Sequence, residues 1–143
     1  MEPLSVAIHS VANLGDFRAN QSIVIFGCGP IGLLCMAVAK ALVASRVIAI
    51  DIVPDRLEFA KKYAATEVYL PPAPGTGESK LAYSRRNAEL MKKQLGIEDR
   101  GKNAVDLVLD ASGAEASIQT AFYIAKAGGT FVQVGHITIL LPP

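Results

Sequence analysis

The chain contains little cysteine, and its two cysteines are not placed for metal or redox chemistry. Cys28 and Cys35 are seven positions apart, so they lack the CxxC spacing of zinc knuckles and thioredoxin-like sites. Both are most simply interpreted as reduced thiols. Reduced thiols are typical of the cytoplasm, where we expect this protein to work.

Neither sign of charge dominates the sequence. It has 14 Lys and Arg against 13 Asp and Glu, a formal net charge of +1. This balance gives no electrostatic reason to expect nucleic acid or a membrane surface as a partner. The basic stretch at residues 80–93 is interleaved with Glu89 and followed by two acidic residues. We therefore interpret it as a solvated helix face.

Long apolar segments are also missing. The longest apolar run, residues 31–39, ends at Lys40 and is too short to span a bilayer. The first residues, Met-Glu-Pro, lack the basic flank and apolar core of a signal peptide.

What the sequence does contain is an alternation of short apolar runs with segments of helical spacing. With 143 residues, 51% of them hydrophobic, the chain has the size of one domain. This alternation predicts a Rossmann-type α/β fold, a doubly wound parallel sheet with helices on both faces, in strand order 3-2-1-4-5 with a partial sixth strand at 136–143. The predicted strands are 22–26, 46–50, 67–70, 105–109 and 130–134, and the predicted helices are 3–13, 31–44, 54–63, 80–95 and 114–126, the last ended by Gly128 and Gly129.

A glycine motif lies between the first predicted strand and the helix that follows it. Gly27, Gly29 and Gly32 form the pattern GxGxxG, which gains meaning from this strand–helix context. We expect Gly27 to permit the tight turn, Gly29 to let the backbone approach a pyrophosphate, and Gly32 to permit close packing of helix and strand. Backbone N–H groups at the helix start would bind the phosphates.

An acidic residue follows the second predicted strand at the distance that dinucleotide-binding folds use. Asp51 comes nineteen positions after Gly32 and is placed to accept hydrogen bonds from the adenosine ribose hydroxyls. A carboxylate there would repel a 2′-phosphate, which predicts NAD rather than NADP. An ordinary glycine turn and a methyltransferase that binds S-adenosylmethionine are the alternatives. The tight spacing of the third glycine disfavours the methyltransferase.

Four stretches of the sequence resemble the zinc-dependent medium-chain dehydrogenases, most closely their sorbitol and xylitol dehydrogenase branch. They are EPLSV at 2–6, FGCGPIGLL at 26–34, VIAID at 47–51 and GGTFVQVG at 128–135. The resemblance implies NAD-linked, reversible oxidation of xylitol or sorbitol to a ketose, with a small-molecule polyol or ketose as substrate.

The resemblance also implies a set of coenzyme-binding residues. The pyrophosphate would lie on the loop from Gly27 to Gly32, the ribose on Asp51, and the adenine beside Arg56. The nicotinamide riboside would pass the strand ends that include Ser112 and Val134. The full expected set is Gly27, Cys28, Gly29, Pro30, Ile31, Gly32, Asp51, Ile52, Arg56, Ser112, Gly113, Val134 and Gly135, and Glu2 is expected near the catalytic zinc of the full-length protein, as a ligand or through a water.

Departures from the family pattern limit what these residues can do alone. The family's zinc ligands, a Cys and a His-Glu pair, belong to an N-terminal catalytic domain, and neither His9 nor His136 is followed by Glu. Val43 stands where the family pattern predicts a glycine. The tail after residue 135 also differs from the family pattern. We expect residues 1–19 to lead from that domain and residues 20–143 to form the NAD-binding domain, with no catalytic residue in the chain and no activity by the chain in isolation. A stand-alone, non-enzymatic NAD-binding module is the alternative, and the open sheet edge would permit pairing with a second copy.

Overall fold

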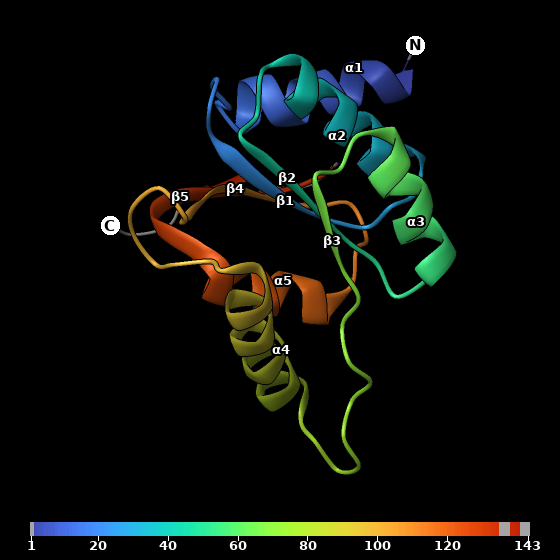
Figure 1. Cartoon of the computed structure of the whole chain (residues 1–143), viewed down its shortest axis with the longest axis vertical. Coiled ribbons are helices and arrows are strands. Elements are labelled where there is room, and N and C mark those ends of the chain that lie inside the picture. Colours follow the sequence, from blue (N-terminus) through green and yellow to red (C-terminus); the bar gives the residue numbers. More distant parts are fainter. Residues whose placement is uncertain (1, 135–137, 141–143) are drawn as a thin grey trace.

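A six-stranded sheet forms the centre of the molecule (Figure 1). The structure is a computed structural model that describes residues 2–134 and 138–140, with the side chains of residues 3–134. The sheet has the order β3-β2-β1-β4-β5-β6, in which β1 to β5 are parallel. The strands are β1 (Ser22–Phe26), β2 (Arg46–Ile50), β3 (Glu67–Tyr69), β4 (Val105–Asp110), β5 (Ala125–Gln133) and β6 (Thr138–Leu140).

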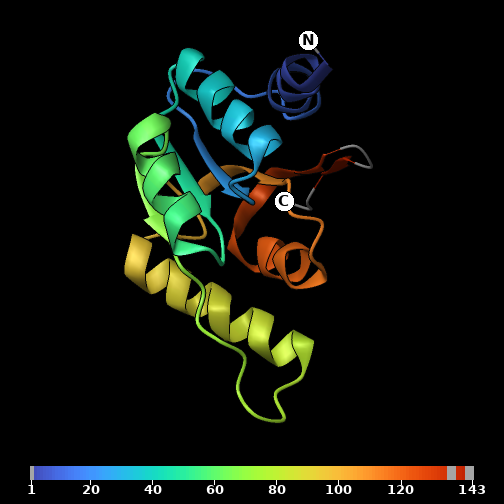
Figure 2. The ribbon, with the colours of Figure 1, turned by 90° about the vertical axis from the view of Figure 1, so that its right-hand side faces the viewer.

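Helices cover both faces of the sheet, as Figure 2 shows from the side. They are α1 (Glu2–Ile8), η1 (His9–Leu14), α2 (Pro30–Ala41), α3 (Pro54–Tyr63), α4 (Lys80–Leu95) and α5 (Glu115–Ile124). One core cluster joins the sheet to α1, η1, α2 and α3, and a second joins it to α4 and α5. The Rossmann-type α/β prediction and the predicted strand order are confirmed. The division of the chain at residue 20 stays a prediction.

The two central strands show why this order forms. All five residues of β1 are buried, and four of the five in β2 are buried. A strand that is apolar along its whole length can bury both faces only in the interior of a sheet with helices above and below. The carboxyl ends of β1, β2 and β4, which are interior strands, therefore lie side by side at one end of the sheet.

Two predicted helices differ at their ends. The first continues past Ile8 as a π-helical turn, with the Gly15 N–H donating to the Ser10 carbonyl at 2.9 Å. The last was predicted to run to Lys126 and to end at Gly128 and Gly129. This prediction was wrong: it ends at Ile124, because Ala125 is extended and already pairs with Val105 of β4. Gly128, at φ +76°, instead permits the irregular register between β4 and β5.

The partial sixth strand exists and joins the sheet, but it is not parallel to the other strands. Residues 138–140 pair with β5 in antiparallel orientation, with Phe131 opposite Ile139. A parallel connection needs about a dozen residues to cross over the sheet, and only four separate β5 from β6. The short connection therefore allows only a hairpin.

Val43, at the end of α2, takes the conformation that a glycine would take there. Its φ is +65°, and its carbonyl accepts a 2.7 Å hydrogen bond from the Asn20 N–H. A β-branched residue in this left-handed region is strained, and the valine is 67% exposed, so little packing offsets the strain.

We therefore expect Val43→Gly to stabilise the chain. Relief of left-handed strain contributes about 1–2 kcal/mol, and the added freedom of glycine in the unfolded chain takes back roughly half of it. The melting temperature followed by circular dichroism should rise by about 2 °C. Val43→Ala keeps a Cβ atom and should bring no comparable rise. A glycine variant that melts below the natural chain would contradict this interpretation.

Candidate functional site

The glycine loop follows the carboxyl end of β1, between the ends of β2 and β4. Gly27 has φ +102°, and its N–H donates to the Ile50 carbonyl at 2.7 Å, which ties the loop to the end of β2. A Cβ atom at Gly32 would lie 1.9 Å from the carbonyl oxygen of Gly27. Gly27 and Gly32 thus permit the turn and the close approach of α2 to it, which are the structural roles that the motif predicts.

Gly29 differs from both, because it faces open space. A Cβ atom there would meet nothing within 4 Å. Gly29 is the N-cap of α2, Pro30 occupies the first helical position, and no side chain caps this helix end. A helix N-terminus of this kind carries partial positive charge and free N–H groups. It suits a phosphate group, provided that no side chain stands in front of it.

Asp51 joins the glycine loop to the loop after β2. Its Oδ2 accepts a 2.8 Å hydrogen bond from the Cys28 N–H, and its Oδ1 accepts one of 2.9 Å from the Val53 N–H. Each carboxylate oxygen has a second lone pair. The two backbone bonds therefore fix the carboxylate in place and leave it able to accept hydrogen bonds from a ligand.

Cys28 sits inside this loop but is not a reactive group. Burial, reinforced by the nearby Asp51 carboxylate, raises the pKa of the Cys28 thiol to about 12. Burial alone raises the pKa of Cys35 to about 12 as well. Because the thiolate is the nucleophile, neither cysteine carries nucleophilic chemistry near neutral pH.

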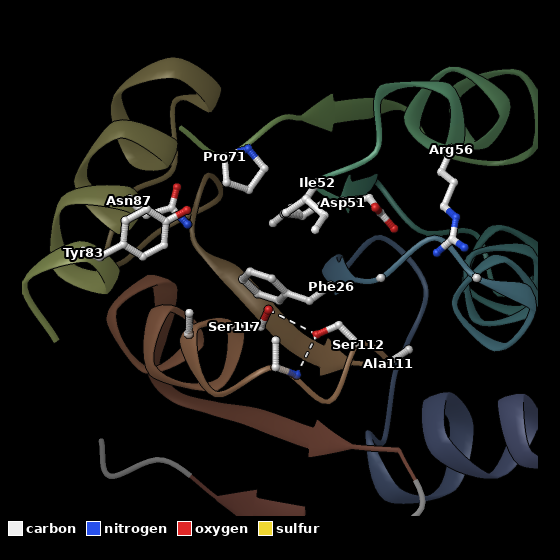
Figure 3. Close-up of a pocket in the computed structure, with 15 residues that line it drawn as sticks. Phe26, Asp51, Ile52, Arg56, Pro71, Tyr83, Asn87, Ala111, Ser112 and Ser117 are labelled. Carbon is white, nitrogen blue, oxygen red and sulfur yellow. Dashed lines mark hydrogen bonds between the residues drawn. The ribbon is translucent and has the colours of Figure 1, made fainter. Parts of the chain in front are cut away.

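A cavity of about 370 Å³ opens beside the loop (Figure 3). Six of the residues expected at the coenzyme site line it: Gly27, Gly29, Asp51, Ile52, Arg56 and Ser112. Phe26, at the end of β1, lies between the two sides of this cavity, and Ile52 is 78% exposed. Phosphate-binding backbone, a fixed carboxylate and an apolar surface thus lie along one continuous cavity.

A second cavity of about 300 Å³ lies on the other side of the end of β4. Three further expected residues, Ile31, Gly113 and Val134, line it together with Ser112. Ser112 lines both cavities. Together the two cavities offer adjacent spaces on either side of the loop after β4, as a ligand with two halves requires.

The remaining expected residues lie elsewhere. Cys28, Pro30 and Gly32 line neither cavity; Cys28 is 3% exposed, and its side chain packs into the core cluster below the loop. Gly135 and the side chain of Glu2 lie outside the described part of the structure.

A buried carboxylate that the sequence analysis did not single out shapes the loop between the two cavities. Asp110 is 1% exposed. Its Oδ1 accepts hydrogen bonds from Ser112 N–H at 3.1 Å and from Ser112 Oγ at 2.6 Å, and its Oδ2 accepts one from Gly113 N–H at 3.2 Å. Asp110 thereby holds Ser112 at the junction of the two cavities.

The far wall of the larger cavity also comes from residues that sequence reasoning missed. Tyr83 and Asn87 of α4 line it together with Pro71 (Figure 3). They belong to the basic stretch that was interpreted as a solvated helix face. Their four-residue spacing places them on one side of the helix, and this was the only signal in the sequence.

The loop between β3 and α4 is pinned against this wall. Arg86 makes two 2.9 Å hydrogen bonds to the Glu78 carboxylate, which also accepts one from the Gly75 N–H. Arg86 is the main reason why the pKa of Glu78 falls to about 2. The Tyr83 hydroxyl donates to the Pro72 carbonyl at 2.7 Å. These contacts fix the rim of the cavity beside Tyr83.

The residues that the structure describes do not fit a zinc ion. Among them, no three His, Cys, Asp or Glu side chains are grouped so that they could hold a metal. His9 instead lies 3.2 Å from the Asn13 amide on η1. Nor does any helix in residues 2–134 have the length and apolar character needed to cross a membrane.

Residues 30–141 match the family model described as "Zinc-binding dehydrogenase". Among curated relatives, D-xylulose reductase A from Aspergillus niger is 49% identical over 135 residues, and Probable D-xylulose reductase A from Arthroderma otae is 45% identical over 135 residues. Each alignment covers 94% of this chain and 34% of the relative. The chain thus spans about a third of the length of the curated relatives it matches.

Two solved structures of dehydrogenases share the fold of this chain. An alcohol dehydrogenase from a Thermus species aligns with a TM-score of 0.68 and 27% identity, over 92% of this chain and 33% of that one. A putative zinc-binding dehydrogenase from Sinorhizobium meliloti, solved with NADP bound, aligns with a TM-score of 0.70 and 25% identity, over 98% of this chain and 35% of that one.

Proposed function

The chain belongs to the zinc-binding dehydrogenase family, as its sequence motifs indicated, and on this premise we propose that it is the coenzyme-binding part of an NAD-dependent polyol dehydrogenase. The observation that carries the proposal is the single cavity lined by Gly29, Asp51 and Ile52. The proposed reaction is the interconversion of xylitol, or a similar polyol, and its ketose, in line with the names of the D-xylulose reductases that the chain resembles.

Each part of NAD has a matching part of the site. The pyrophosphate would lie at the start of α2 in front of Gly29, where no Cβ atom intrudes. The adenosine ribose would bind the Asp51 carboxylate, with the adenine between Ile52 and the far wall, away from Arg56, which lies at the opposite end of the cavity. The nicotinamide would extend into the smaller cavity past Ser112 and Val134. Bound there, NAD would supply the acceptor for a hydride from the polyol.

Zinc and the chemical step are not assigned to the described residues. A catalytic zinc site needs about three protein ligands, and no such group is present among them. Glu2 could contribute to zinc binding only together with ligands from outside these residues. The proposed role of this chain is therefore to bind and orient the coenzyme, and none of its residues is proposed as a catalytic acid, base or nucleophile.

We also propose that the protein works in the cytoplasm and that a second copy pairs with an edge of the sheet. The two buried, free thiols fit a reducing compartment. An edge strand presents unpaired backbone groups that another chain can join.

The choice of coenzyme is tested by replacing Asp51. We expect Asp51→Ala to weaken NAD binding by about 1–3 kcal/mol, because a hydrogen bond to a charged group is lost. Affinity for NADP should rise, because the negative charge that repels the 2′-phosphate is gone. Parallel calorimetric titrations of both coenzymes measure the two changes.

Asp51→Asn is the matched control, since it keeps the side-chain shape and one acceptor oxygen but loses the charge. The alanine variant also leaves both the Cys28 and the Val53 N–H groups without their partner, whereas the asparagine variant keeps an acceptor for one of them and so comes closer to isolating the charge. A natural chain that already prefers NADP over NAD would refute the assignment of Asp51.

A further inference from the structure

The far wall of the larger cavity contains a polar side chain that the coenzyme assignment has not used. We propose that Asn87 recognises the adenine base by donating a hydrogen bond from its side-chain amide to a ring nitrogen, and that Tyr69 fixes the orientation of that amide. This inference rests on the proposed NAD-binding function, because it identifies the residue that distinguishes the base.

Asn87 is buried, yet it reaches the cavity. It is 3% exposed, and it lines the cavity beside Tyr83, at the end away from Arg56 (Figure 3). Polar side chains this well buried are normally satisfied by partners. Both the oxygen and the nitrogen of the Asn87 amide are therefore expected to have hydrogen-bond partners.

The carbonyl of the Asn87 side chain already has its partner. The Tyr69 hydroxyl donates to Asn87 Oδ1 at 2.9 Å, and Tyr69 is itself 2% exposed at the end of β3. This bond places the carbonyl toward β3. In consequence the two N–H donors of Nδ2 lie on the other side of the amide from the Tyr69 hydroxyl.

These donors have no acceptor among the described residues. Within residues 3–134, the side chain of Asn87 makes one hydrogen bond, which it accepts from Tyr69. Among the described residues no buried side-chain nitrogen or oxygen lacks a hydrogen-bond partner, so the unpartnered Nδ2 is not sealed in the core, and Asn87 lines the cavity. The site is therefore suited to a ligand that brings an acceptor atom to this wall.

The order of residues along the cavity selects which part of the ligand meets Asn87. Gly29 lies at the phosphate end and Asp51 at the ribose, and the cavity continues past the exposed side chain of Ile52 to Asn87. The group attached to that ribose on the side away from the phosphates is the base. Adenine has a flat apolar face that can pack on Ile52. Its ring nitrogens can accept a hydrogen bond from Asn87.

Two variants remove the donor without leaving Tyr69 unpaired. Asn87→Asp keeps an oxygen for the Tyr69 hydroxyl and replaces the donor by an acceptor. The pair Tyr69→Phe with Asn87→Leu removes both members of the hydrogen bond, which costs little in stability when the shapes are kept. Circular dichroism and melting temperature show whether each variant folds.

The probe is ADP, together with three analogues in which N1, N3 or N7 of the base is replaced by C–H. We expect both variants to bind ADP about tenfold more weakly, the effect of one buried hydrogen bond. One of the three analogues should show a similar loss with the natural chain and no further loss with the variants, because the two changes remove the same contact.

The alternative results separate the two proposals. If the natural chain does not bind ADP, the proposed coenzyme function fails, and this inference fails with it. If the natural chain binds ADP but the folded variants bind it equally well, or if all three analogues bind the natural chain as ADP does, Asn87 does not read the base and the coenzyme function stands.

Discussion

Replacing Gly32 by alanine is expected to lower the free energy of unfolding by about 3 kcal/mol, the upper end of what overpacking a tight contact costs. The added Cβ atom would lie 1.9 Å from the Gly27 carbonyl oxygen. Gly27 cannot easily move away, because its φ of +102° and its hydrogen bond to Ile50 fix it to the centre of the sheet. The clash must therefore displace α2 or distort the turn.

Urea unfolding followed by circular dichroism measures this loss, since the chain has no tryptophan for fluorescence. Gly29→Ala is the matched control, because the same added atom meets nothing within 4 Å there. The two variants should differ clearly in midpoint. Equal stability of Gly32→Ala and the natural chain would show that α2 does not pack on the loop as described.

Gly29→Val is expected to reduce NAD affinity by at least about 100-fold, or about 2.7 kcal/mol, while the fold is kept. The valine side chain would fill the open space in front of the α2 N-terminus, where the pyrophosphate needs direct access to backbone N–H groups. The fold should tolerate it, because φ at Gly29 is −77° and the backbone is extended.

Isothermal titration with NAD gives the affinity, and circular dichroism gives the fold. Gly29→Ala completes a series in which the side chain grows in steps, so the loss of affinity should grow with it. A folded Gly29→Val variant with unchanged affinity would remove the glycine loop from the binding site.

The parts of the fold that follow from local pattern could be predicted from the sequence. The apolar residues of β1 and β2 indicate interior parallel strands, and a GxGxxG motif between strand and helix indicates which sheet edge binds a ligand. Asp51 could be placed because parallel strands end at the same edge. These inferences need only the spacing along the chain.

Other features depend on which segments meet in space, and the sequence does not show this. Asn87 looks like one polar residue in a basic, solvated helix, and only the folded structure shows that it is buried and lines the cavity. In the sequence, Asp110 is only the residue that follows a predicted strand. Its hydrogen bonds to Ser112 and Gly113 show that it shapes the loop after β4. The antiparallel direction of β6 follows from a connection of four residues, whose length is known only once the ends of β5 and β6 are known.

Titration of the natural chain with NAD, followed through its backbone amide resonances, tests the central claim most directly. If the glycine loop, the end of β2 and the loop after β4 form one coenzyme site, the largest changes should fall on Gly27, Gly29, Ile52 and Ser112, with saturation at a single affinity and a weaker response to NADP. Changes confined to other surfaces, or none at saturating NAD, would contradict the account.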